Sequence, residues 1–125
     1  MSRRYLTQEE AETRLRLGRP VEQWLGRKDS TAGAVLRWLR IEKDKSGHYT
    51  TTLFEVLDAP NLGIFDIYEF QALDVDNPFG TTHIAESEAL AIDHAVNVLG
   101  AERSRFVNAG VVQDEYRDTR SSESQ

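Results

Sequence analysis

Two runs of strand-forming residues flank a polar turn, and this hairpin pattern constrains the fold more than any other feature of the sequence. The turn is the Lys-Asp-Lys-Ser-Gly segment at 43–47, and the run at 48–57 is rich in threonine, aromatic and β-branched residues. The apolar residues of 34–42 fit the helical and the strand period only in part, but two such runs about a five-residue turn favour a β-hairpin. Segment 64–73 follows another turn and predicts a third antiparallel strand, which completes a meander.

Local signals predict short helices before the hairpin. Thr7 and Glu10 have the spacing of a capping box, and the helix that they start is expected to end near Gly18. Proline suits the first position of a helix because its φ is fixed, so 20–26 is predicted as a second short helix. Residues 27–33 are small and polar, which favours a loop.

A longer helix is predicted after the strands. Ser87 is a suitable N-cap and Gly100 a suitable stop, and the apolar residues between them form a stripe at helical spacing. The segment 74–82 contains Asn, Pro and Gly and is predicted as a loop. Beyond the helix, 106–112 is expected to be a fourth strand or an irregular segment, and 113–120 a short final helix.

The length and composition of the chain fit one domain. A chain of 125 residues leaves no room for a second core of ordinary size. We therefore expect a single α+β domain over 1–120, with a disordered tail over 121–125. The domain would be a three- to four-stranded antiparallel sheet, a meander, with one long helix packed on it and short N-terminal helices.

Cysteine usage and hydropathy exclude several classes of protein. The chain has no cysteine, which excludes disulfides, thiol catalysis and cysteine-bound metals. No apolar run approaches the roughly eighteen residues of a membrane span. A cytoplasmic protein without membrane association is expected.

Charge is distributed unevenly along the chain. Residues 1–47 carry a balance of +4 and residues 48–125 a balance of −10, for a formal net charge of −6. No lysine or arginine stands between Lys45 and Arg103, whereas ten carboxylates do. The net charge argues against direct nucleic-acid binding, which needs a basic surface.

Two interpretations of the acidic stretch compete. In the first, its carboxylates are neutralised by arginines of the first helix or merely solubilise the protein. In the second, they form one anionic surface that docks a basic protein partner. The second interpretation predicts a non-catalytic binding protein that neutralises a toxin or regulates a partner, with Phe79 beside Pro78 as an exposed anchor. The predicted partner-binding residues are Asp66, Glu69, Asp74, Asp76, Phe79, Glu86 and Glu88.

The order of the predicted elements is similar to that of two known families. Double-stranded RNA-binding domains have the same order of helix, three strands and helix. They hold phosphates with a basic start to the last helix, whereas Glu86, Glu88 and Asp93 stand there in this chain and would repel RNA. The chain also resembles antitoxins of the HicB type, which join a hairpin, a third strand and a helix that opens in an acidic, alanine-rich stretch such as 86–90. That resemblance implies the neutralisation of a toxin.

Two further classes of function are open. A small hydrolase or ligand-binding protein would use a site near His83 with Asp74 and Asp76, and a structural subunit would form a homodimer through an exposed aromatic strip. His94 is expected to pack at the edge of the core. The segment 74–80 starts like a calcium loop but lacks the later ligands, so no metal or other cofactor is expected.

Overall fold

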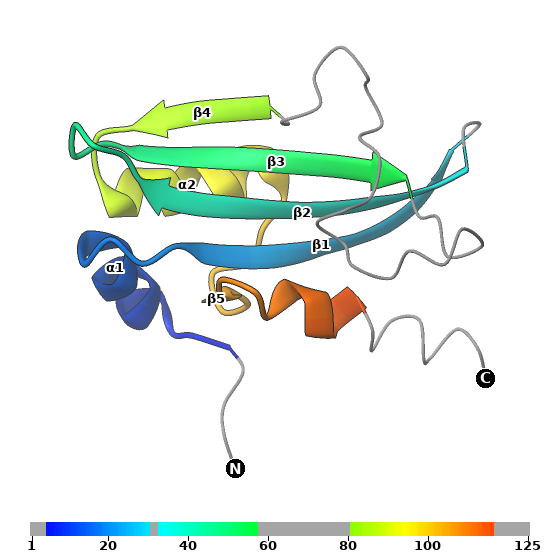
Figure 1. The fold of residues 1–125 in the computed structure, drawn as a ribbon, viewed down its shortest axis with the longest axis horizontal. Helices are drawn as coiled ribbons and strands as arrows, with labels where there is room; N and C mark the ends of the chain where they lie inside the picture. The colour runs from blue at the N-terminus through cyan, green and yellow to red at the C-terminus, as the bar shows by residue number, and fades with distance from the viewer. Residues whose placement is uncertain (1–4, 31–32, 58–80, 117–125) are drawn as a thin grey trace.

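A five-stranded antiparallel sheet organises the part of the chain that the structure, a computed structural model, describes: residues 5–30, 33–57 and 81–116. The strand order is β4-β3-β2-β1-β5, and both long edges of the hairpin are extended by further strands (Figure 1). The elements in chain order are α1 (Gln8–Arg16), β1 (Val21–Ser30), β2 (Gly33–Lys43), β3 (Tyr49–Leu57), β4 (Thr81–Ala85), α2 (Glu88–Leu99) and β5 (Val107–Asn108). The α+β class is confirmed, with five strands instead of three or four.

The predicted hairpin is confirmed as β2 and β3. The two strands pair in antiparallel register from Lys43 opposite Tyr49 to Val35 opposite Leu57. Asp44 closes the turn, because its carboxylate accepts hydrogen bonds from the backbone N–H groups of Ser46 and His48. The pKa of Asp44 is lowered, first by a hydrogen bond from the Ser46 hydroxyl.

The predicted helix at 20–26 is wrong, and so is the predicted loop over 27–30 and at 33, because β1 runs from Val21 to Ser30 and β2 begins at Gly33. Proline at a first helical position is a weak local signal, and long-range pairing overrides such signals. The glycine expected to end the helix, Gly26, has a φ of +109° and lies where the register shifts at a bulge.

The predicted end signals of two helices are confirmed. The Thr7 hydroxyl accepts from the Glu10 N–H and the Glu10 carboxylate from the Thr7 N–H, which completes the capping box of α1. Ser87 caps α2, and Gly100 ends it with a left-handed backbone at φ 80°. No helix among the described residues is long and apolar enough to cross a membrane.

Several predictions concern segments at the limits of the described residues. The loop expected at 74–82 is corrected at its end, because Thr81 and Thr82 begin β4, which pairs with β3. Of the segment 106–112, predicted as a strand or irregular, only the two residues of β5 form a strand. Residues 112–116 are helical. The third strand at 64–73 and the tail at 121–125 lie outside the described residues.

Apolar side chains pack on both faces of the sheet. On one face, α1 and α2 cover the central strands and form the larger core around Leu15, Leu39 and Ile92. On the other face, Trp38 stacks on Phe54 with ring centroids 4.1 Å apart, and residues 112–116 pack over this smaller core. The sheet therefore separates two cores, and successive side chains along a strand point to opposite faces of the sheet.

A fully buried carboxylate joins β1 to its neighbours. Glu22 is 0% exposed, and its Oε2 accepts from Arg40 Nε at 2.9 Å and Arg40 Nη2 at 2.8 Å. Its Oε1 accepts from the backbone N–H of Gly110 at 2.8 Å, just after β5. Since a buried charge is tolerated only when paired and hydrogen-bonded, these contacts fix the register of three strands.

Replacing Glu22 with Gln should lower the free energy of unfolding by about 3 kcal/mol, because Arg40 and the Gly110 N–H lose a buried anionic partner. Urea denaturation followed by circular dichroism measures the change. Glu55→Gln is the matched control, since Glu55 pairs with Arg37 across β2 and β3 at 3.4 Å but is 42% exposed. That exposed pair should contribute less than about 1 kcal/mol, and equal losses in the two variants would contradict the assignment.

Candidate binding site between the sheet and helix α2

The structure describes two of the seven predicted partner-binding residues. Glu86 is exposed in the connection from β4 to α2, and Glu88 opens α2. The remaining five lie outside the described residues; they are Asp66, Glu69, Asp74, Asp76 and Phe79. Partner binding by this set therefore stays a prediction.

The carboxylate of Glu88 is engaged within the molecule. Its Oε1 accepts from Arg16 Nε at 3.2 Å and Nη2 at 3.0 Å, which ties α2 to α1. The pKa of Glu88 is lowered by its own backbone N–H at the helix start and by hydrogen bonds from Arg16 and Tyr49. Burial and the contact with Glu88 raise the pKa of Tyr49 in turn. Glu88 thus joins two helices and β3.

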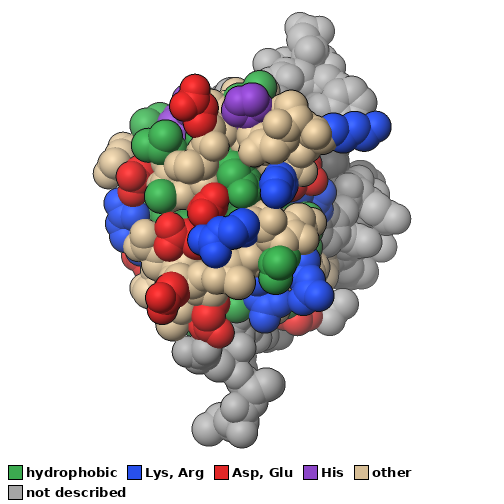
Figure 2. All heavy atoms as spheres, turned by 90° about the vertical axis from the view of Figure 1, so that its left-hand side faces the viewer, with side chains coloured by type: hydrophobic (Ala, Val, Ile, Leu, Met, Phe, Trp, Pro, Cys, Tyr) green, Lys and Arg blue, Asp and Glu red, His purple; other side chains and the backbone are tan. Residues whose placement is uncertain are grey.

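Other described carboxylates of the acidic stretch also lie next to arginines. Figure 2 shows basic and acidic side chains intermixed on one end of the molecule. Besides the Glu88 contact, the ion pairs are Arg37–Glu55 at 3.4 Å, Arg103–Asp93 at 2.8 Å and Arg105–Glu102 at 3.7 Å. The anionic surface predicted from the sequence therefore depends on Glu86 and on the segment 58–80, which lies outside the described residues.

A cavity of about 200 Å³ opens between β3, β4 and α2. The strand register places Thr51 directly opposite His83, on the face of the sheet that α2 covers. The helix contributes His94 and, one turn later, Val98 to the opposite wall. The complete lining is Thr51, Leu53, Thr82, His83, His94, Val98 and Leu99.

Two histidines stack at this cavity. The ring centroids of His83 and His94 are 3.6 Å apart, with 7° between the ring planes. The pKa of His94 is lowered, first by burial and then by the neighbouring His83. At neutral pH His94 is therefore a neutral imidazole with one donor and one acceptor nitrogen. Within the described ranges, no three His, Cys, Asp or Glu side chains gather closely enough to hold a metal ion.

The hydroxyl of Thr51 is the unsatisfied group of the cavity. Thr51 is 1% exposed, and its Oγ1 has no hydrogen-bond partner among the residues that the structure describes. A buried hydroxyl without a partner costs about 1–3 kcal/mol. The cavity therefore presents a buried polar group that a bound molecule can satisfy.

An apolar stripe on α2 leads to the cavity. Leu90, His94 and Val98 follow one another at helical spacing and share one side of the helix. Leu90 is 53% exposed and Val98 66% exposed, in contrast to the buried Ile92 on the core side. The apolar pattern of the sequence points to the core side, so this second stripe was missed. Apolar residues four positions either side of His94 are the signal that could have revealed it.

Comparisons with known proteins give no information on the function of this site. No family model, curated protein or solved structure matches the chain. The likenesses to RNA-binding domains and to HicB-type antitoxins accordingly add nothing to the contacts described above.

Replacing Thr51 with Val should raise the free energy of unfolding by about 1 kcal/mol. Valine has nearly the same shape as threonine, and its methyl group replaces the unsatisfied hydroxyl. Urea denaturation measures the change. Thr50→Val, on the opposite face of the same strand, controls for the strand preference of valine. A loss of stability specific to Thr51→Val would contradict the absence of a partner.

Protonation of His94 should reduce the stability of the protein below neutral pH. Because folding lowers the pKa of this group, the unfolded state binds its proton more readily, and the free energy of unfolding decreases as the pH falls below about 6.5. His94→Phe should flatten this part of the pH profile, measured by urea denaturation between pH 5 and 8 (roughly the range in which histidine titrates). A wild-type slope in His94→Phe would contradict this assignment.

Proposed function

We propose that the chain is a non-catalytic binding protein that docks a basic protein partner on α2 and β4. The observation that carries this proposal is the buried Thr51 hydroxyl, which lacks a partner among the described residues and lines a cavity. The docking surface consists of the cavity and the exposed residues Leu90 and Val98 beside it. The cavity receives one anchoring side chain of the partner.

The size and lining of the cavity favour an anchoring side chain. Pockets for drug-sized molecules have volumes of about 300–1,000 Å³, whereas this one has about 200 Å³. Leu53 and Leu99 offer apolar walls to the stem of a side chain, and Thr51 offers a hydrogen bond to its polar tip. Buried anchors of this kind supply most of the binding energy in many protein interfaces.

The charge of the adjoining sequence favours a basic partner. Glu86 is exposed directly after β4, and Asp74 and Asp76 precede the same strand by less than ten residues. No lysine or arginine stands between Lys45 and Arg103. Carboxylates that flank a pocket increase the rate of encounter with a cationic surface and its selectivity. Toxin neutralisation and regulation of a basic protein are the concrete forms of this proposal.

A small-ligand or hydrolytic role is the second candidate. The cavity brings a threonine hydroxyl and two imidazoles together, and these are groups that proton-transfer and nucleophilic chemistry use. In that case a small molecule, and no protein, would satisfy Thr51. A structural homodimer, the third candidate, would instead bury the α2 stripe against a second copy.

Val98→Asp should weaken partner binding, because it places a charge in the apolar part of the docking surface. Asn97→Asp adds the same charge at the neighbouring exposed position and is the matched control. Immobilised wild-type protein and both variants are incubated with lysate of the source cell at low and high salt, and retained proteins are identified by mass spectrometry. A retained basic protein is then titrated calorimetrically against all three.

The proposal predicts a Kd that rises at least about tenfold in Val98→Asp, changes little in Asn97→Asp and increases with salt. Equal binding by Val98→Asp, or binding indifferent to salt, would contradict it. Self-association of the wild type that Val98→Asp removes, measured by sedimentation, would favour the homodimer.

A further inference from the structure

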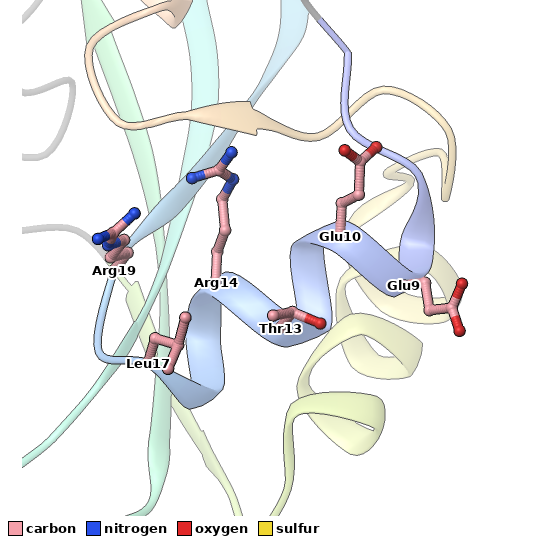
Figure 3. A pocket seen from close by; sticks show the side chains of 6 residues that line it. All are labelled: Glu9, Glu10, Thr13, Arg14, Leu17 and Arg19. Carbon is pink, nitrogen blue, oxygen red and sulfur yellow. The ribbon is translucent and has the colours of Figure 1, made fainter.

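A helix-ending motif brings two arginines together at the end of α1. Gly18, with a φ of +81°, donates its N–H to Leu15 O at 3.0 Å, and Arg19 donates its N–H to Arg14 O at 2.8 Å. This pair of hydrogen bonds is a Schellman motif, which reverses the chain at the helix end. Figure 3 shows the guanidinium groups of Arg14 and Arg19 on the same side of α1.

The motif usually brings apolar side chains together at these two positions, because they contact each other over the last turn. Here both positions hold an arginine, and two guanidinium groups repel each other. Arg14 Nε is also buried and has no acceptor among the described residues. A group that carries negative charge and accepts hydrogen bonds would relieve both the repulsion and the unsatisfied donor.

The two arginines line a cavity with a volume of about 410 Å³. This size suits a small molecule. Its lining consists of Glu9, Glu10, Thr13, Arg14, Leu17 and Arg19. The Leu17 side chain is 68% exposed and offers an apolar contact, and Thr13 adds a hydroxyl. The Glu10 carboxylate accepts from the Thr7 N–H and is thus committed to the helix cap.

We propose that this cavity binds a small molecule through a carboxylate group held by Arg14 and Arg19. The flat guanidinium matches the planar geometry of a carboxylate. The two glutamates in the lining disfavour phosphate, which concentrates up to two negative charges on a single group beside them, whereas each carboxylate group carries one. The site shares no lining residue with the His83–His94 cavity, so it does not depend on the proposed partner binding.

Titration of the ¹⁵N-labelled full chain tests the site. Glutarate, a small dicarboxylate, and inorganic phosphate are added separately at matched ionic strength, and the Arg14 Nε–Hε signal is followed by NMR together with the backbone amides of 13–19. Glutarate should shift these signals saturably and bind more tightly than phosphate. Absence of a saturable shift, or tighter binding of phosphate, would overturn the proposal.

Two variants distinguish a specific binding site from nonspecific electrostatic attraction of anions. Arg14→Lys keeps the charge but lacks the Nε–H, and Arg19→Gln removes the second cation. Each should raise the Kd for glutarate about tenfold or more, as expected for the loss of a charged hydrogen bond. Arg27→Gln, an exposed arginine of β1 outside the cavity, should leave the Kd unchanged. Glutarate binding of wild-type strength in both cavity variants would show the proposal to be wrong.

Discussion

The antiparallel pairing of β1 with β2 is the interaction on which the rest of the described structure depends. It places Glu22 opposite Arg40 on one face and turns Gln23 to the other, where its amide bonds both the N–H and the C=O of Glu102. A slip of one residue would exchange the faces and drive a carboxylate into the apolar core under the helices. Polar groups therefore fix this register together with apolar burial. Strand β2 also pairs with β3 along its other edge.

The two cavities arise from one physical circumstance. Each of them lies beside regular backbone hydrogen bonding, the β3–β4 ladder in one case and the Schellman motif of α1 in the other. A buried side-chain atom nearby, Thr51 Oγ1 or Arg14 Nε, nevertheless lacks a partner among the described residues. Unsatisfied buried groups reduce stability, so their presence beside open volume is the reason for assigning binding to both places. The carboxylate of Glu88, by contrast, already accepts hydrogen bonds from Arg16 within the chain, so we assign it a structural role.

The candidate site could be predicted from the sequence only in part. His83 stood out as a histidine near acidic residues, and it does line a cavity. Thr51 and His94 could not be found in this way, because they reach His83 through strand register and through packing of α2 across tens of residues. Their neighbours in sequence carry no sign of that contact. The acidic stretch shows the same limit, since charge counts cannot tell which carboxylates lie beside arginines.

By itself the sequence determined the features whose causes lie within a few residues. These are the capping box of α1, the turn at Asp44 with the hairpin around it, and the Ser87 and Gly100 ends of α2. Only the tertiary structure decided that 21–30 is a strand, that Glu22 is buried and paired, and that Thr51 faces a cavity. Capping and turn formation are local hydrogen-bond events, whereas burial and strand pairing depend on which distant segments come to lie alongside.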